Sequence, residues 1–483
     1  MSENKLDRRA FLKLGASASA MALLAACAKK PAATEAPVTA PTEAPAEATE
    51  APTEAPTEAP AAEEPTPIPT TAPRLYGEGE IEIVVWYQDW EGANRIMRKV
   101  SEDYAEKHPE AKVNLQAIGY GDLFAKLLPS IAAGNEGDIM MMYTNWVVGT
   151  DIRQVFLDIT EPAGGYQFWK DAMWEAPLST VDMPEGKVFY LPWLAGIRGA
   201  TMTVNVDHLK EAGIDYLSFK TYEEVIDAGK KLTQFDASGK MTRAGYAINN
   251  SQNCLLYNLI WELGGKMYDK ATGKWSWNSA EGEEAAKRLY DIYWTHQTSS
   301  YDLYTGEFQG VSEGLISIWG DGAWTASVQN QVAGINTDNI VTPPITDGVN
   351  DDLYPDHIAG WGLSKRLAGD QEKLRVALDY ALVCVGPDAT IAAFEDYSGV
   401  CMTKAVYEDP RIEQVKFGKM SKRVATGMWP RGRYNQDHVA DMGPAYTELD
   451  RAMRKEISIQ EALANMDAYC QEQEDAARER IGL

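Results

Sequence analysis

The sequence predicts an α/β fold built on a parallel sheet, because strand and helix patterns alternate from residue 81 onward. The first strand is the apolar run 81–86, which is rich in β-branched residues. A helix follows and ends before Pro109. Its apolar residues recur at the spacing of one helical face: Ala93, Ile96, Met97, Val100 and Tyr104.

A second strand, a second helix and a third strand follow with the same alternation. Apolar residues alternate at Val113, Leu115 and Ala117, as in a strand with one buried face. A second helix is marked by Phe124, Leu127, Leu128 and Ile131, and the turn 134–137 leads into a strand at 138–143. Ligands of such sheets bind beyond the carboxyl ends of the strands. Here those ends are 86–90 and 143–146.

The first twenty-seven residues have the parts of an export signal. Arg8 and Arg9 precede an apolar run of small residues that is too short to span a membrane, which takes roughly twenty apolar residues. The paired arginines are similar to a twin-arginine signal, although Asp7 departs from that pattern, so Sec export stays open. The ending Leu24-Ala25-Ala26-Cys27 resembles a bacterial lipobox and predicts a lipid anchor on Cys27.

Residues 28–75 consist almost entirely of Ala, Pro, Thr and Glu. A chain of this composition has too little apolar surface to offset its conformational entropy. We therefore predict a disordered, proline-stiffened tether that holds the body away from a membrane. Whether the tether is glycosylated stays open.

The formal net charge of −26 argues against nucleic acid as a partner and against direct binding to anionic lipid. The chain contains no nucleophile elbow, phosphate loop or dinucleotide fingerprint. The histidines lack metal-ligand spacing, and no cofactor or metal is expected. Sequence leaves open whether the body cysteines form disulfides or stay as buried thiols: Cys254, Cys384, Cys401 and Cys470.

Motifs spread over about four hundred residues resemble the family 1 extracellular solute-binding proteins, the sugar-type receptors of ABC importers. In the first part they are the strand ending Val85-Trp86, the helix closed by 107–109, and the run 131–134 that leads into Asp138-Ile139. Further along are 190–192, 204–207, 209–214, the helix start Thr221 to Glu224, 263–265, 308–324, 358–363 and 458–463. Gly137 and Val204 depart from the family's usual Pro and Tyr.

This resemblance implies a two-lobe periplasmic-binding-protein-like fold of type II topology, with discontinuous lobes joined by a hinge. The first lobe would comprise 76–198 and 365–410, and the second 199–364 and 411–483. The implied protein is a monomeric, non-enzymatic lipoprotein on the outer face of the cytoplasmic membrane. It would capture a mono- or oligosaccharide between the lobes and deliver it to the permease subunits of an ABC transporter.

Two other function classes remain open from the residues alone. One is a secreted carbohydrate-active enzyme, since carboxylates are plentiful and no pair is singled out. The other is a receptor for a non-sugar solute such as a polyamine, a metal complex or glycerol phosphate, for which Arg198 and Arg431 could form an anion clamp.

Candidate ligand residues combine aromatic rings with polar groups, because sugars present apolar faces and hydroxyls together. The chain has 14 Trp and 23 Tyr against 10 Phe. We assign Trp261, Trp294, Tyr290 and Tyr293 to helix packing. By the resemblance, the ligand-binding candidates are Trp86, Gln88, Asp89, Trp90, Tyr143, Asn145, Trp146, Arg198, Asn250, Gln252, Asn253, Asp321, Trp324, Trp361, Trp429 and Arg431.

Overall fold

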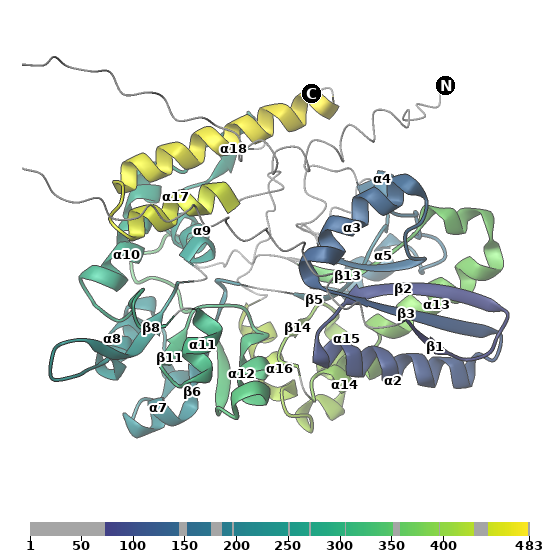
Figure 1. The fold of residues 1–483 in the computed structure, drawn as a ribbon, viewed down its shortest axis with the longest axis horizontal. Helices are drawn as coiled ribbons and strands as arrows, with labels where there is room; N and C mark the ends of the chain where they lie inside the picture. The colour runs from purple at the N-terminus through teal and green to yellow at the C-terminus, as the bar shows by residue number, and fades with distance from the viewer. Residues whose placement is uncertain are drawn as a thin grey trace, which may run out of the picture. The chain divides into compact units, whose positions relative to one another are not determined.

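The computed structural model describes residues 73–143, 152–174, 186–195, 198–249, 252–269, 272–304, 306–350, 358–395, 397–428 and 443–481. They belong to one compact unit, Ala72–Leu483. The predicted signal, Cys27 and the predicted tether up to residue 72 lie outside the described residues. The end of the predicted tether is wrong, because residues 74 and 75 belong to strand β1, Arg74–Tyr76. Within the described ranges the strands form a seven-stranded sheet, a five-stranded sheet and a two-stranded hairpin (Figure 1).

The seven-stranded sheet begins with the predicted parallel unit. Strand β2 pairs in parallel with β3 on one side and with β4 on the other. The sheet order is β1-β3-β2-β4-β13-β5-β14, with bounds Arg74–Tyr76, Ala111–Ile118, Ile81–Gln88, Ile139–Tyr143, Ile358–Leu363, Leu191–Ala195 and Val400–Cys401. The predicted strand–helix alternation is therefore confirmed. Strand β2 runs to Gln88, two residues beyond the predicted strand.

Helices α2 (Glu91–Lys107) and α3 (Tyr120–Ala133) lie on opposite faces of the β2–β3 pair (Figure 1). All five apolar residues predicted for the core face of α2 are buried. In α3 the buried face instead carries Leu123, Leu127 and Ser130, whereas Phe124 is 45% exposed. The predicted helix is therefore present, but Phe124, one of the four residues that mark it, lies outside the core. Helix α3 ends at Gly134, whose φ of 70° suits glycine.

Strand β13 pairs antiparallel with both β4 and β5. The sequence-based lobe boundary placed residues 358–363 in the second lobe, but the structure places this strand inside the seven-stranded sheet. Likewise Phe417, Met420 and Val424 pack into the core of that sheet, although the boundary assigned everything after residue 410 to the second lobe. Both differences arise because the chain returns to the first sheet between β12 and β13 and stays there until 428.

The five-stranded sheet has the order β12-β6-β11-β8-β7. Its bounds are Thr337–Val341, Thr201–Asn205, Ile316–Trp319, Met241–Ala247 and Gln234–Phe235, and the hairpin consists of β9, Tyr268–Asp269, and β10, Lys274–Trp275. Strand β8 is parallel to β11, so their carboxyl ends meet at one edge. The predicted capping box of α8 (Tyr222–Leu232) is present, formed by Thr221 and Glu224.

The remaining helices cover the two sheets. Those that contribute residues to the core of the seven-stranded sheet include α4 (Ile152–Val155), α5 (Tyr166–Ala172), α13 (Gln371–Val385), α14 (Pro387–Ala393), α15 (Lys404–Glu408) and α16 (Gly418–Met428). Those nearer the second sheet are α7, Val206–Glu211, α9, Gln252–Glu262, α10, Ala280–Trp294, α11, Glu307–Ser312, α12, Thr325–Ala333, α17, Gly443–Met453, and α18, Ile459–Ile481. Within the described ranges the 3-10 helices are η3, Tyr216–Ser218, η4, Lys365–Gly369, and η5, Pro410–Glu413.

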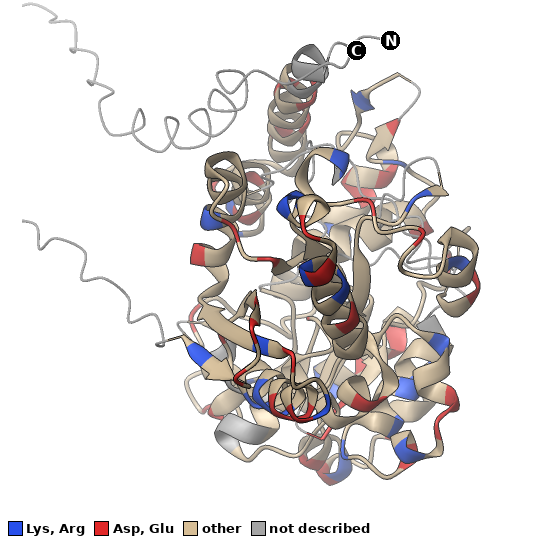
Figure 2. Cartoon of the chain, turned by 90° about the vertical axis from the view of Figure 1, so that its right-hand side faces the viewer, with Lys and Arg blue, Asp and Glu red and all other residues tan. Residues whose placement is uncertain are grey.

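Acidic and basic residues are interspersed over the elements seen in Figure 2. In the described part of the chain no disulfide joins Cys254, Cys384, Cys401 or Cys470, and all four side chains are buried. Among the described residues, no single helix is both long and apolar enough to cross a membrane, and only the bent pair α13–α14 meets that criterion when both helices are taken together.

Candidate functional site

The carboxyl ends of β2 and β4 bring together side chains from two loops. The Tyr143 hydroxyl donates to Oε1 of Gln88, which joins the ends of the two strands. The next residue, Asp89, is held by Asn94, whose Nδ2 lies 2.7 Å from Asp89 Oδ1. Asn94 in turn accepts a hydrogen bond from the Tyr87 hydroxyl at 2.8 Å. The parallel pairing of β2 with β4 thus places an amide, a carboxylate and a phenol at one edge.

Aromatic rings lie beside these polar groups. The Trp90 ring centroid is 4.6 Å from that of Tyr397, at an interplanar angle of 45°. Burial raises the pKa of both Tyr143 and Tyr397, so both phenols are protonated at neutral pH and can donate hydrogen bonds. Tyr397 was not among the sequence candidates. It lies between a helix and the short strand β14, and nothing in its local pattern distinguishes it from a core residue.

The Trp86 side chain is enclosed by other groups of the protein. Only 3% of its surface is exposed. Its Nε1 donates to Gln116 Oε1 at 2.9 Å, and Lys126 Nζ lies 4.0 Å from the ring centroid. Its indole N–H and one ring face are therefore engaged within the first sheet and α3. A ligand contact of Trp86 stays a prediction.

On the second sheet, Arg198, Asp321 and Trp324 come together. Arg198 Nε lies 2.9 Å from Asp321 Oδ1, and the Asp321 side chain is fully buried. The guanidinium carbon of Arg198 is 5.4 Å from the Trp324 ring centroid. Thr201 donates to the Asp321 carbonyl at 2.9 Å, which fixes the loop after β11 against the start of β6.

The first turn of α9 positions two more candidates. Gln252 accepts hydrogen bonds from the hydroxyls of Tyr293 and Tyr301 at 3.3 and 3.2 Å, and donates to Asp450 at 3.1 Å. Its amide is therefore held by side chains from α10, from the segment after it and from α17. Burial raises the pKa of Tyr446, whose hydroxyl also bonds the Asn253 side chain. Tyr301 and Tyr446 were likewise missing from the sequence candidates.

Of the helix-packing assignments, Tyr293 is 5% exposed but Trp294 is 40% exposed. The assignment of Trp294 to the interior is wrong: its Nε1 bonds the Met453 carbonyl and Lys455 covers its ring at 3.5 Å.

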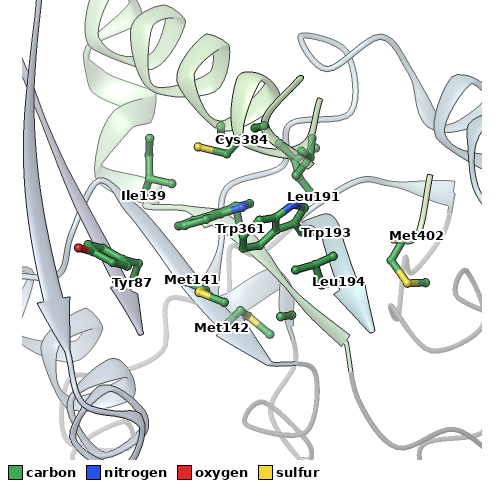
Figure 3. Close-up of a cluster of buried hydrophobic side chains, with 14 of the residues drawn as sticks. Tyr87, Ile139, Met141, Met142, Leu191, Trp193, Leu194, Trp361, Cys384 and Met402 are labelled. Carbon is green, nitrogen blue, oxygen red and sulfur yellow. The ribbon is translucent and has the colours of Figure 1, made fainter. Parts of the chain in front are cut away.

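Trp361 lies inside the core of the first sheet, next to Trp193 (Figure 3). Its exposed fraction is 0%, and the two ring centroids are 5.9 Å apart. The neighbouring glycines leave room for protein side chains: a Cβ on Gly360 would lie 2.6 Å from the Tyr190 ring, and one on Gly362 would lie 2.3 Å from the Phe156 ring. Trp361 therefore packs in the core of the first sheet, and its contact with a ligand stays a prediction.

A buried hydrogen bond links the segment that carries Tyr397, beside Trp90, to the first turn of α12, which follows Trp324. Ser327 N donates to Ser398 Oγ at 2.7 Å. Ser398 follows Tyr397 of the first group, while Ser327 Oγ donates to the carbonyl of Trp324 in the second at 2.8 Å. The first turn of α12 therefore lies against the segment that carries Tyr397. The candidates Asn145, Trp146, Asn250, Trp429 and Arg431 lie outside the described residues, and so does Cys27.

Within the described ranges there is no group of three or more His, Cys, Asp or Glu residues that could hold a metal ion. The arrangement offers aromatic faces beside neutral amides, phenols, and carboxylates held by Asn94 and Arg198. Such a set suits a neutral, polyhydroxylated ligand.

Comparison with known protein families gives one match. The family described as bacterial extracellular solute-binding protein matches residues 89–365. This match confirms the resemblance seen in the sequence. Comparison with curated proteins finds no match.

Many solved structures share the fold. An ABC substrate-binding protein from Listeria monocytogenes, in complex with cycloalternan, aligns with a TM-score of 0.65 at 18% identity, covering 83% of this chain and 99% of that one. The maltose/maltodextrin-binding domain MalE from Bdellovibrio bacteriovorus, bound to maltotriose, aligns with a TM-score of 0.65 at 14% identity, covering 81% and 99%. The GacH receptor of Streptomyces glaucescens aligns with a TM-score of 0.63 at 16% identity, covering 83% and 98%. The predicted two-lobe fold is thereby confirmed.

Proposed function

The chain belongs to the bacterial extracellular solute-binding protein family, and from this premise we propose that it is the receptor of an ABC importer for a carbohydrate. Members of an extracellular family are exported proteins, and the members of this family bind solutes. The ligand would lie between the group around Gln88, Trp90 and Tyr143 and the group around Arg198, Asp321 and Trp324. The lobes that carry these groups would comprise 73–195 with 358–428, and 198–350 with 443–481.

The observation that carries the proposal is the pairing of ring faces with fixed polar groups on both sheets. Trp90 and Tyr397 offer rings next to Gln88 and Asp89, and Trp324 offers a ring next to Asp321. Sugar C–H faces pack on aromatic rings, and their hydroxyls need carboxylate and amide partners. Three of the matched structures are named for sugar ligands, cycloalternan, maltotriose and acarbose, which agrees with this chemistry.

One contact disfavours an anionic ligand such as glycerol phosphate. The charge of Arg198 is already compensated by the fully buried Asp321 at 2.9 Å. An anion placed on this guanidinium would have to compete with a carboxylate that has no access to solvent.

Thermal unfolding with a ligand panel tests the proposal. The panel contains mono- and oligosaccharides, putrescine and glycerol 3-phosphate. We expect only sugars to raise the melting temperature, because a ligand of the folded state stabilises it in proportion to ln(1 + [L]/Kd). Stabilisation by putrescine or glycerol 3-phosphate alone would contradict the sugar assignment. Chromatography of the incubated sugars tests the enzyme alternative, for which hydrolysis products are required.

We propose in addition that Cys27 anchors the protein to the outer face of the cytoplasmic membrane, where it delivers its ligand to permease subunits as a monomer. The lipobox-like ending 24–27 and the tether-like segment behind it support this location. Replacing Cys27 by Ser should release the protein from the membrane fraction or stall its processing. Normal cleavage together with membrane retention of the variant would contradict the anchor.

A further inference from the structure

Helix α3 carries two large aromatic side chains in solvent. Tyr120 is 46% exposed and Phe124 is 45% exposed. Residues four apart lie on the same face of a helix, so the two side chains project from one face of α3. The adjoining face of α3 carries the buried Leu123 and Leu127. Packing of α3 against its sheet therefore accounts for the leucines and leaves the two aromatic side chains without a role in the core.

This aromatic pair is continuous with the candidate site. The Tyr120 ring centroid is 5.6 Å from that of Tyr143, and the rings are tilted by 60°. Tyr143 is the residue whose hydroxyl bonds Gln88 at the end of β2. An aromatic row thus leads from the strand ends onto the exposed face of α3.

Two of the other exposed aromatic side chains in the described ranges, Phe168 and Trp294, have a different setting. Phe168 on α5 is 57% exposed and meets Trp169 edge to face at 5.5 Å. Trp294 on α10 carries Lys455 over its ring. Neither ring has a contact with a candidate ligand residue among the ring pairs described here, whereas Tyr120 does.

We propose that Tyr120 and Phe124 form an additional aromatic subsite for a sugar unit, and that the ligand is therefore an oligosaccharide rather than a single monosaccharide. The inference rests on the proposed function. One unit would contact Trp90, Gln88 and Asp89, and a further unit would stack on the α3 pair after passing Tyr143. Stacking of a sugar face needs ring area and no charge, which is what the α3 pair supplies.

Affinity measured along sugar series of increasing length tests this subsite. The full-length protein is titrated calorimetrically with glucose, maltose, maltotriose and maltotetraose, and with the corresponding β-1,4-linked glucose and xylose series. In the series that binds, we expect Kd to fall by about tenfold or more between the monosaccharide and the trisaccharide. Tyr120→Ala combined with Phe124→Ala should remove most of that gain.

Phe168→Ala is the matched control, because it also deletes an exposed ring but from α5. We expect it to keep the dependence on sugar length. The melting temperature of the α3 double variant should stay close to that of the wild type, since both rings are nearly half exposed.

The outcomes separate this inference from the proposed function. Sugar binding that does not strengthen with length, or a double variant that keeps the length dependence, overturns the α3 subsite and leaves the sugar receptor intact. A double variant that keeps sugar affinity but no longer stimulates the ATPase of its transporter in proteoliposomes makes the α3 pair a docking surface and also overturns the subsite. Absence of binding to every sugar overturns both.

Discussion

Arg198 and Asp321 form an ion pair at 2.9 Å in which the carboxylate has no exposed surface and the guanidinium side chain is 27% exposed. The pair joins the segment just before β6 to the loop after β11, two segments 123 positions apart in the chain. The sequence indicates Asp321 only as a candidate ligand contact. The burial of its side chain means that its loss should affect folding as well.

Asp321→Asn should lower the free energy of unfolding by about 1–3 kcal/mol, because the change leaves Arg198 without its charged partner. Urea unfolding measures this loss, and titration with the sugar found by the panel measures affinity in parallel. Asp227→Asn is the control, since Asp227 pairs with Lys230 in an exposed i,i+3 ion pair, which contributes little. A wild-type unfolding midpoint for Asp321→Asn would contradict the structural role of the pair.

Trp90→Ala should weaken sugar binding by about tenfold while leaving the melting temperature nearly unchanged. The Trp90 ring is half-buried against Tyr397 and lies over Gly92, where a Cβ would come within 2.2 Å of the ring. Trp169→Phe is the comparison: Trp169 is 4% exposed and its Nε1 bonds the Ala163 carbonyl, so this change should cost stability and spare affinity. A loss of stability without a loss of affinity in Trp90→Ala, together with a loss of affinity in Trp169→Phe, would contradict this assignment of the two tryptophans.

Periodicity predicted the parallel unit well, because its strands and helices bury one face each. Val113, Leu115 and Ala117 are all buried on β3. In α3, however, both Leu123 and Phe124 are apolar and adjacent, so the pattern fits two neighbouring helix faces. Only packing against β2 selects Leu123 for the interior.

Candidate site residues were harder to predict, since a tryptophan suits a core and a sugar site equally. Trp361 was a candidate stacking ring for the ligand. In the structure it stands between two glycines that make room for Tyr190 and Phe156 in the core. Tyr397 reaches Trp90 only through tertiary contacts between segments about 300 residues apart, and no local pattern encodes such a contact.

The pairing of Arg288 with Asp347 should make stability depend on pH in the acid range. Two nitrogens of Arg288 lie 2.9 and 2.7 Å from the two Asp347 oxygens, and this hydrogen bonding holds the pKa of Asp347 below its usual value. A carboxyl whose pKa is lowered by folding stabilises the protein above its unfolded pKa, and that contribution is lost as pH falls through the folded pKa.

Asp347→Asn should therefore melt below the wild type at pH 7, and the difference should shrink as pH falls below about 4, the ordinary pKa of an aspartate, toward the lower pKa of the folded state. Because the Asp347 side chain is 61% exposed, the difference at pH 7 should be small and should shrink in high salt. Scanning calorimetry at several pH values measures it. A gap that widens toward acid would contradict the pairing.

The four body cysteines should behave as unreactive thiols, which answers a question that the sequence left open. All four are free and buried. Burial raises the pKa of Cys401 to about 11 and that of Cys470 to about 12, and it also raises the pKa of Cys384. At pH 8 the reactive thiolate of Cys401 is then about one part in a thousand.

A protein that begins at Pro73, so that Cys27 does not contribute, should react slowly with a disulfide reagent such as DTNB when native. It should release four equivalents once denatured without reductant. Its melting temperature should be the same with and without dithiothreitol, because no covalent loop restricts the unfolded chain. Fewer than four titratable thiols in the denatured, unreduced protein, or a melting temperature that falls on reduction, would show that a disulfide forms after export.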